Sequence, residues 1–269
     1  MPILQLTHAL VQAANVFAAQ NNLQFEASSI NNIHLINTQT DLPNNTLIIN
    51  NEGETFESQK VIVNQTLQPS PQTIAFEQKI TNEIQTQTTQ GYQFGLQLDQ
   101  TALIHILFNK YNVTVATSFK YNPSTQIIYN SEYNVTWREN VTLEVPPRTK
   151  TVVTYSVLVG LLCKNIHYKI TLSGQLLFRL KSDPSKTMLL PLTYKGNRKQ
   201  SVGDILSGLY NIETSDANDN LDIQGSLHIK GALGLKSSTR IKNIPYRGNP
   251  SSSTEQTIPG QQATSVVFL

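Results

Sequence analysis

Residues 100–120 read QTALIHILFNKYNVTVATSFK, with apolar side chains at alternate positions on both sides of a short polar stretch. The sequence Asn-Lys-Tyr-Asn at 109–112 suits a four-residue loop between two strands. Antiparallel pairing of Phe108 with Val113 brings the alternate apolar residues of both arms onto one side. We therefore expect a β-hairpin with one apolar face and one mixed face.

The faces of this hairpin differ enough to suggest two different environments. The apolar face carries Ala102, Ile104, Ile106, Phe108, Val113, Val115, Thr117 and Phe119. The mixed face carries Thr101, Leu103, His105, Leu107, Thr114, Ala116, Ser118 and Lys120. Each arm has about nine residues, enough for a tilted strand to cross a bilayer. Strands cross lipid only as closed barrels, so one hairpin per chain would imply an oligomer. An ordinary buried hairpin is the alternative.

The rest of the chain predicts a mainly β protein with one N-terminal helix. Apolar residues recur at helical spacing over residues 4–19, and Asn21-Asn22 ends that pattern. From Lys60 to Ile244 the sequence favours one strand after another, several of them longer than usual in globular proteins. Long strands rich in Ser, Thr and Gln indicate an elongated β protein and not a compact sandwich.

Composition narrows the class of protein. The 269 residues are 39% hydrophobic and only 14% charged, while Asn, Gln, Ser and Thr supply 97 residues. A net charge of +2 is too small for a protein that binds nucleic acid through phosphate contacts. Cys163 is the one cysteine, which excludes an intramolecular disulfide and a cysteine-based zinc site. No stretch is long and apolar enough for a transmembrane helix, and we expect no cleaved signal peptide.

Sequence motifs for catalysis are absent. The chain has no GxSxG, HExxH or phosphate-binding loop, and its five histidines lack metal-ligand spacing. Asp216, Asp219 and Asp222 could suit calcium, but without the spacing of an EF-hand a solvated turn is the simpler interpretation. We therefore expect no enzyme activity, no catalytic residue, no cofactor and no resident metal.

Three stretches resemble the aerolysin-like β-pore-forming toxin family, in its epsilon-toxin and mosquitocidal-toxin branch with related Bacillus parasporal crystal proteins. The first is QKITNEIQTQTTQGYQFG at 78–95, and the second is the hairpin at 100–120. The third is SEYNVTWRENVTLEVPPRTKTVVTYSV at 131–157. The opening MPILQLTHALVQAANVFA also resembles the N-terminal helix of the small crystal proteins. The resemblance covers residues 1–20 and about 60–160.

The resemblance implies an elongated aerolysin-like fold of long antiparallel strands and a β-sandwich, with one N-terminal helix, divided into several regions. These are residues 1–60 as N-terminal helix and head, together with 181–220; 61–180 as the long-strand region; 221–247 as C-terminal strands of the sandwich; and 248–269 as a flexible tail or propeptide. The tail could equally be an extension laid on the body. The expected head segments hold few aromatic residues, and the receptor-binding residues stay unknown.

The implied function is that of a protoxin that binds a cell surface, is cut by a protease, forms a ring and inserts one hairpin per chain. Its receptor would be a glycan, a lipid or a GPI-anchored protein. The candidate activation sites are Arg240, Lys242 and Arg247. The eight residues of the apolar face would contact lipid, and Leu103, His105, Thr114, Ala116 and Ser118 would face the lumen.

Two alternative functions stay open, and the first of them shares the expected fold. One is a non-toxic parasporal crystal protein with a storage or structural role. The other is a carbohydrate-binding β-sandwich module. For a family member we expect a bacterial inclusion, or release by lysis, followed by the target-cell membrane.

Overall fold

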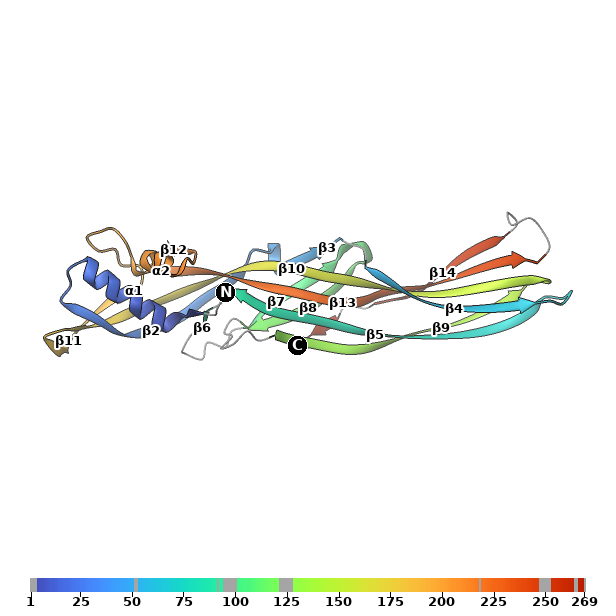
Figure 1. Cartoon of the computed structure of the whole chain (residues 1–269), viewed down its shortest axis with the longest axis horizontal. Helices are drawn as coiled ribbons and strands as arrows, with labels where there is room; N and C mark the ends of the chain where they lie inside the picture. The colour runs from blue at the N-terminus through green and yellow to red at the C-terminus, as the bar shows by residue number, and fades with distance from the viewer. Residues whose placement is uncertain are drawn as a thin grey trace.

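Two long strands run along an elongated molecule (Figure 1). The computed structural model describes residues 4–50, 53–90, 92–93, 101–120, 128–217, 219–246, 253–263 and 266–268. Strand β10 (Thr149–Leu180) has 32 residues and β13 (Asn220–Pro245) has 26. They pair antiparallel from Thr149 with Pro245 to Leu172 with Leu221. At about 3.3 Å per residue, β10 alone spans roughly 100 Å.

These two strands lie at the centre of a sheet whose path is β11-β10-β13-β5-β9. Further strands complete the edges: β2 and β4 pair with β10, and β12 and β14 pair with β13. The bounds of these strands are β2 (Phe25–Thr40), β4 (Glu54–Asn64), β5 (Ser70–Gln90), β9 (Ile128–Val145), β11 (Asp183–Pro191), β12 (Thr214–Ala217) and β14 (Thr254–Gln262).

The remaining elements are short. A second sheet of four strands has the order β15-β8-β7-β3, and β1 pairs with β6. The bounds are β1 (Leu4–Gln5), β3 (Thr46–Ile49), β6 (Tyr92–Gln93), β7 (Thr101–Phe108), β8 (Val113–Lys120), β15 (Val266–Phe268), and two single-turn 3₁₀ helices, η1 (Pro43–Asn45) and η2 (Asn109–Tyr111).

One end of the molecule, here called the head, carries α1 (Leu6–Gln20), β2, β11, α2 (Val202–Tyr210) and β12 (Figure 1). Helix α1 buries Leu6, Leu10 and Phe17, the stripe that the sequence predicts. It ends at Gln20 with Asn21 as its C-cap, and the following Asn22 has a positive φ of 55°. The side chains of α1, α2 and the hairpin β7–β8 belong to one continuous core with β10 and β13.

Helix α2 was not predicted. Its start is fixed by a capping box, in which the Ser201 hydroxyl accepts from the Asp204 amide and the Asp204 carboxylate accepts from the Ser201 amide. The helix ends at Asn211, whose φ of 51° and ψ of 48° are left-handed.

The opposite end is a two-layer β-sandwich. Strands β5 and β9 pack across β10 and β13 around a second core, in which the Phe76 and Tyr155 rings stack with centroids 5.4 Å apart. This core comprises Ile74, Phe76, Ile80, Trp137, Val141, Val153, Tyr155, Val157, Val159 and Ile241. The mainly β, elongated architecture with an N-terminal helix is therefore as the sequence predicts.

The chain segments are distributed along the molecule in a non-sequential way. Residues 183–217 and 6–40 meet in the head, whereas 54–64 form β4 at the sandwich end, paired with residues 149–159 (Figure 1). Within the expected tail or propeptide, β14 pairs with β13 and β15 pairs with β8.

Candidate functional site

The hairpin β7–β8 has the register that the sequence predicts. Phe108 pairs with Val113, Ile106 with Val115, and Thr101 with Lys120 at the open end. The loop contains the single turn η2, and Asn112 closes it in the left-handed conformation, with φ 51° and ψ 39°. Asparagine tolerates that conformation better than most residues, so the loop chemistry and the strand alternation agree.

The apolar face of the hairpin is buried in the protein core. Ile104, Ile106 and Val115 are fully buried, and the other described side chains of this face, Phe108, Val113 and Thr117, are at most 3% exposed. Ala102 and Phe119 belong to the hairpin backbone, but their side chains lie outside the described part. The face expected to contact lipid is therefore covered by protein here.

The Phe108 ring packs directly against the backbone of Gly160 in β10. A Cβ atom built on Gly160 of β10 would lie 2.6 Å from Phe108 Cε1 and 2.6 Å from Leu235 Cδ1. Phe108 and Leu235 are both buried, so neither has open space beside it. The absence of a side chain at Gly160 is what lets the hairpin tip pack this closely.

The mixed face is more accessible. Leu103 is 42% exposed, and His105, Leu107, Thr114 and Ser118 are half-buried. Ala116 differs from this group because it is only 6% exposed. Ala116 is paired with Val267 of β15, a strand that was not predicted from the sequence.

Both edges of the hairpin are occupied by short parallel strands. Strand β3 pairs with β7 from Thr46 opposite His105 to Ile49 opposite Phe108. Strand β15 pairs with β8 over residues 266–268 and 115–117. Segments from the first fifth of the chain and from its last few residues therefore flank the hairpin in the same sheet.

The hairpin tip contacts the body through Tyr111 and Asn109. The Lys236 ammonium of β13 lies 5.0 Å from the centroid of the Tyr111 ring. The Gln262 side-chain amide donates to the Tyr111 carbonyl at 2.6 Å, and the Asn109 amide donates to Asn50 at 3.5 Å. A cavity of about 230 Å³ lies beside the tip and is lined in part by Lys110 and Tyr111.

Most of the sequence matches a known family. The family model described as Clostridium epsilon toxin ETX/Bacillus mosquitocidal toxin MTX2 matches residues 27–255. The chain belongs to this toxin family. No curated protein matches the sequence. The resemblance to the epsilon-toxin and mosquitocidal-toxin family found in the sequence is thus confirmed.

Solved structures share the fold of this ETX/MTX2 family member. The Cry23Aa1–Cry37Aa1 binary complex contains a chain with 19% identity and a TM-score of 0.71, and the match covers 97% of this chain and 98% of that one. A non-toxic crystal protein from Bacillus thuringiensis has 17% identity, a TM-score of 0.61 and coverages of 92% and 99%. The β-pore-forming protein Mpp75Aa1.1 from Brevibacillus laterosporus has 14% identity and a TM-score of 0.53, and the match covers 94% of this chain and 93% of that one.

The candidate cleavage sites of this family member lie in different settings. Arg240 and Lys242 are in β13, where their backbones pair with β10 on one side and β14 on the other. The Arg240 guanidinium also lies 3.9 Å from the Glu255 carboxylate. A protease requires an extended, unpaired segment, so this placement disfavours cleavage at both positions. Arg247 lies outside the described residues.

The acidic residues considered for calcium lie in separate interactions. Asp222 lies 3.0 Å from the Lys169 ammonium and accepts from the Thr171 hydroxyl at 2.7 Å. Asp216 lies 3.9 Å from Lys195, and its pKa is raised, chiefly because the carboxyl is buried. Within the described ranges, no three His, Cys, Asp or Glu side chains gather into a metal-binding group. Neither helix of the described chain is long and apolar enough to cross a membrane.

Proposed function

We propose that this chain is a β-pore-forming protoxin that binds a cell surface, is activated by proteolysis, oligomerises and inserts β7–β8 into the membrane. The observation that carries the proposal is the amphipathic hairpin, whose described apolar-face side chains are almost completely buried in the folded chain. Such a face can be exchanged between a protein core and lipid, because both are apolar environments.

The two strands of the hairpin are slightly shorter than a membrane-spanning strand. Strands β7 and β8 have eight residues each, and a tilted strand needs roughly 9–11 residues to cross the hydrocarbon layer. The chain continues beyond the open end of both strands. In the proposed barrel, the apolar face contacts lipid, while Leu103, His105, Thr114, Ala116 and Ser118 line the lumen.

One hairpin cannot close a barrel, so the proposed pore needs several copies of the chain. Every strand edge within lipid must be paired, and neighbouring hairpins supply those pairs. Activation by cleavage at Arg247 remains our preferred hypothesis, since Arg240 and Lys242 lie between paired strands. We propose storage in an inclusion or release by lysis before the protein reaches its target membrane.

The central test is dye release from vesicles made of target-cell lipids, before and after limited trypsin treatment, with an SDS-resistant oligomer assay on the same samples. Ile106→Asp places a charge on the apolar face, and Thr114→Asp places the same charge on the opposite face. We expect Ile106→Asp to abolish release and Thr114→Asp to retain it. Equal behaviour of the two folded variants would overturn the assignment of faces.

A disulfide lock avoids the risk that Ile106→Asp fails to fold. Ile48 of β3 and Leu107 of β7 are directly paired, at a backbone separation that a disulfide can bridge. In a Cys163→Ser background, Ile48→Cys with Leu107→Cys would tie the hairpin to β3. We expect no dye release from the oxidised protein and full release after reduction. Release from the fully oxidised protein would contradict hairpin insertion.

A non-toxic crystal protein is the second candidate, because a solved protein of that description shares the fold over 92% of this chain. The fold alone does not distinguish the two functions. Intact vesicles and monomeric protein after clean cleavage, on membranes that carry the receptor, would favour this second candidate.

A further inference from the structure

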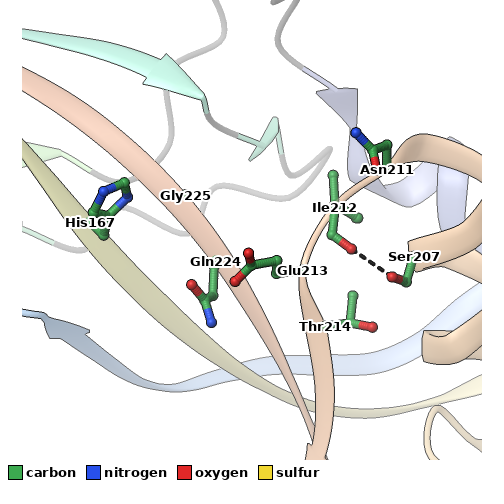
Figure 2. Close-up of a pocket in the computed structure, with 8 residues that line it drawn as sticks. All are labelled: His167, Ser207, Asn211, Ile212, Glu213, Thr214, Gln224 and Gly225. Atoms are coloured by element: carbon green, nitrogen blue, oxygen red, sulfur yellow. Dashed lines mark hydrogen bonds between the residues drawn. The ribbon is translucent and has the colours of Figure 1, made fainter.

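A polar cavity of about 580 Å³ opens in the head beside α2 (Figure 2). Its volume is typical of small-molecule sites, which measure roughly 300–1,000 Å³. The cavity is formed where β10 and β13 pass the end of α2 and the segment that leads to β12. It is lined by His167, Ser207, Asn211, Ile212, Glu213, Thr214, Gln224 and Gly225.

The cavity walls are fixed by hydrogen bonds within the protein. The Ser207 hydroxyl donates to the Ile212 carbonyl at 2.7 Å, and the Thr214 hydroxyl donates to the Gly203 carbonyl at 3.0 Å. The backbone amide of Gln224 donates to the Glu213 carbonyl at 3.1 Å. Because these bonds hold the backbone in place, a ligand would meet a largely preformed surface and lose less binding energy to ordering it.

The opposite wall is also anchored. The His167 backbone amide donates to the Asp41 carboxylate at 3.2 Å, and the Asp41 amide donates to the His167 carbonyl at 3.0 Å. Next to it, the Tyr168 ring packs against Gly225, where an added Cβ would lie 2.4 Å from the ring. The β10–β13 pairing that joins His167 to Ser226 and Tyr168 to Gly225 therefore sets the width of the cavity.

Exposed side chains from three segments line this cavity, namely β10, the stretch between α2 and β12, and β13. Figure 2 shows the Glu213 carboxylate beside the Gln224 amide, with His167 to one side and Asn211 to the other. All four residues are exposed. Amide groups both donate and accept, whereas a carboxylate only accepts. This mixture matches hydroxyl groups, each of which can donate one hydrogen bond and accept others.

The charge of the lining restricts the class of ligand. Lys and Arg are absent from the eight lining residues, and one carboxylate, Glu213, is present. An anionic ligand such as a sulfated or sialylated sugar would meet repulsion without a cationic partner. Ile212 is the one aliphatic side chain in the lining, so a lipid tail would find little apolar surface.

We propose that this cavity binds a neutral, hydroxyl-rich saccharide at the cell surface. The proposal rests on the proposed function in one respect, namely that the protein recognises a cell surface before it inserts. It specifies the chemical class of the receptor and the residues that recognise it, which are Glu213, Gln224, Asn211 and His167.

Binding to neutral oligosaccharides of galactose, mannose and N-acetylglucosamine, displayed on albumin, tests the proposal with the intact soluble chain. We expect Glu213→Ala and Asn211→Gly each to weaken binding about tenfold, as loss of one or more hydrogen bonds would. Asn211→Gly keeps the left-handed backbone favourable while it removes the amide, so folding should be preserved. Glu26→Ala on exposed β2 is the matched control and should bind like the parent chain.

A second experiment uses phosphatidylcholine vesicles that contain or lack a neutral glycosphingolipid. It shows whether the protein recognises the saccharide on a lipid or on a protein carrier. Binding to either the vesicles or the albumin conjugates, lost in both cavity variants, supports the proposal. Three outcomes overturn it: no binding to a neutral sugar, binding only to sulfated or sialylated sugars, and binding that both variants retain.

Failure of this proposal is distinguishable from failure of pore formation. The oxidised Ile48→Cys/Leu107→Cys protein should bind the saccharide normally because the lock lies outside the cavity. Saccharide binding without dye release after reduction would contradict pore formation alone. Dye release without saccharide binding would contradict the cavity assignment alone.

Discussion

Gly160→Ala should loosen the hairpin from the body without altering any residue of the hairpin proposed to insert into the membrane. The new methyl carbon would lie 2.6 Å from both Phe108 Cε1 and Leu235 Cδ1, and each must retreat by about 0.8 Å to reach the 3.4 Å of ordinary van der Waals contact. Phe108 is 1% exposed and Leu235 is fully buried, so the retreat requires repacking. Overpacking of this kind costs about 1–3 kcal/mol.

Much of that strain should disappear when the hairpin leaves, because Phe108 leaves with it. The equilibrium for hairpin release should then shift about 5- to 150-fold, at 1.4 kcal/mol per factor of ten. Amide hydrogen exchange at residues 104–108 and 113–117 should accelerate by a similar factor, while exchange in the β5–β9 pair should change little. Vesicle dye release should begin after a shorter lag.

Two further variants make this prediction specific. Gly208→Ala is the matched glycine substitution, since a Cβ at Gly208 meets nothing within 4 Å, and it should leave hairpin exchange unchanged. Phe108→Leu in the Gly160→Ala background removes ring atoms at the collision and should restore part of the protection. Uniformly faster exchange across the molecule, or hairpin exchange equal to that of the parent chain, would refute the reasoning.

Three other predictions concern the tip, the head and α2. Tyr111→Ala removes the ring beside Lys236 and should cost about 0.5–1 kcal/mol, seen as two- to fivefold faster exchange at residues 109–112. Burial raises the pKa of Asp216, so the parent chain loses stability as pH rises through that pKa. The melting temperature of Asp216→Asn should therefore rise relative to that of the parent chain as the pH increases from 4 to 8. Ser201→Ala removes the α2 cap and should lower unfolding free energy by about 1 kcal/mol in urea titrations.

Each of these three predictions would be contradicted by a specific result. Unchanged exchange in the tip after Tyr111→Ala would show that the cation–π contact does not hold it. A constant difference between Asp216→Asn and the parent across the pH range would contradict a raised pKa. An undiminished unfolding free energy for Ser201→Ala would mean that tertiary packing fixes the start of α2.

The hairpin was predictable from sequence because its determinants are local. Asn109 to Asn112 favour a tight loop, and the alternation on both sides fixes which residues share a face once Phe108 is paired with Val113. A one-residue slip would move the whole apolar set to the other face. The helix ending at Gln20 was predictable for a similar reason, since its apolar spacing and its stop signal lie in one short stretch.

The flanking strands β3 and β15 were not predictable by the same means. Each has three or four residues, too few for a pattern, and each pairs with a segment far away in the chain. The predicted mixed face therefore includes Ala116, which is buried in the folded chain. Helix α2 did carry a local signal, Ser201 followed three residues later by Asp204, within a segment otherwise rich in turn residues.

The head cavity was not predictable from the sequence, because long-range strand pairing brings its lining residues together. His167 and Gln224 lie far apart in the chain and approach only because β10 and β13 pair in a fixed register. No spacing rule connects them. His167 alone, read from sequence, is one of five dispersed histidines.

Assembly of the proposed pore would require the hairpin to exchange its pairing with β3 and β15 for pairing with the hairpins of other copies. Along residues 105–108 and 115–117, the outward backbone groups of the hairpin already pair with β3 and β15. A second copy can add its own hairpin at those positions only after β3 or β15 has left. Strands β3 and β15 and the neighbouring hairpins of the proposed ring would thus compete for the same backbone hydrogen bonds. At these positions the folded chain therefore presents no open strand edge that could start premature assembly.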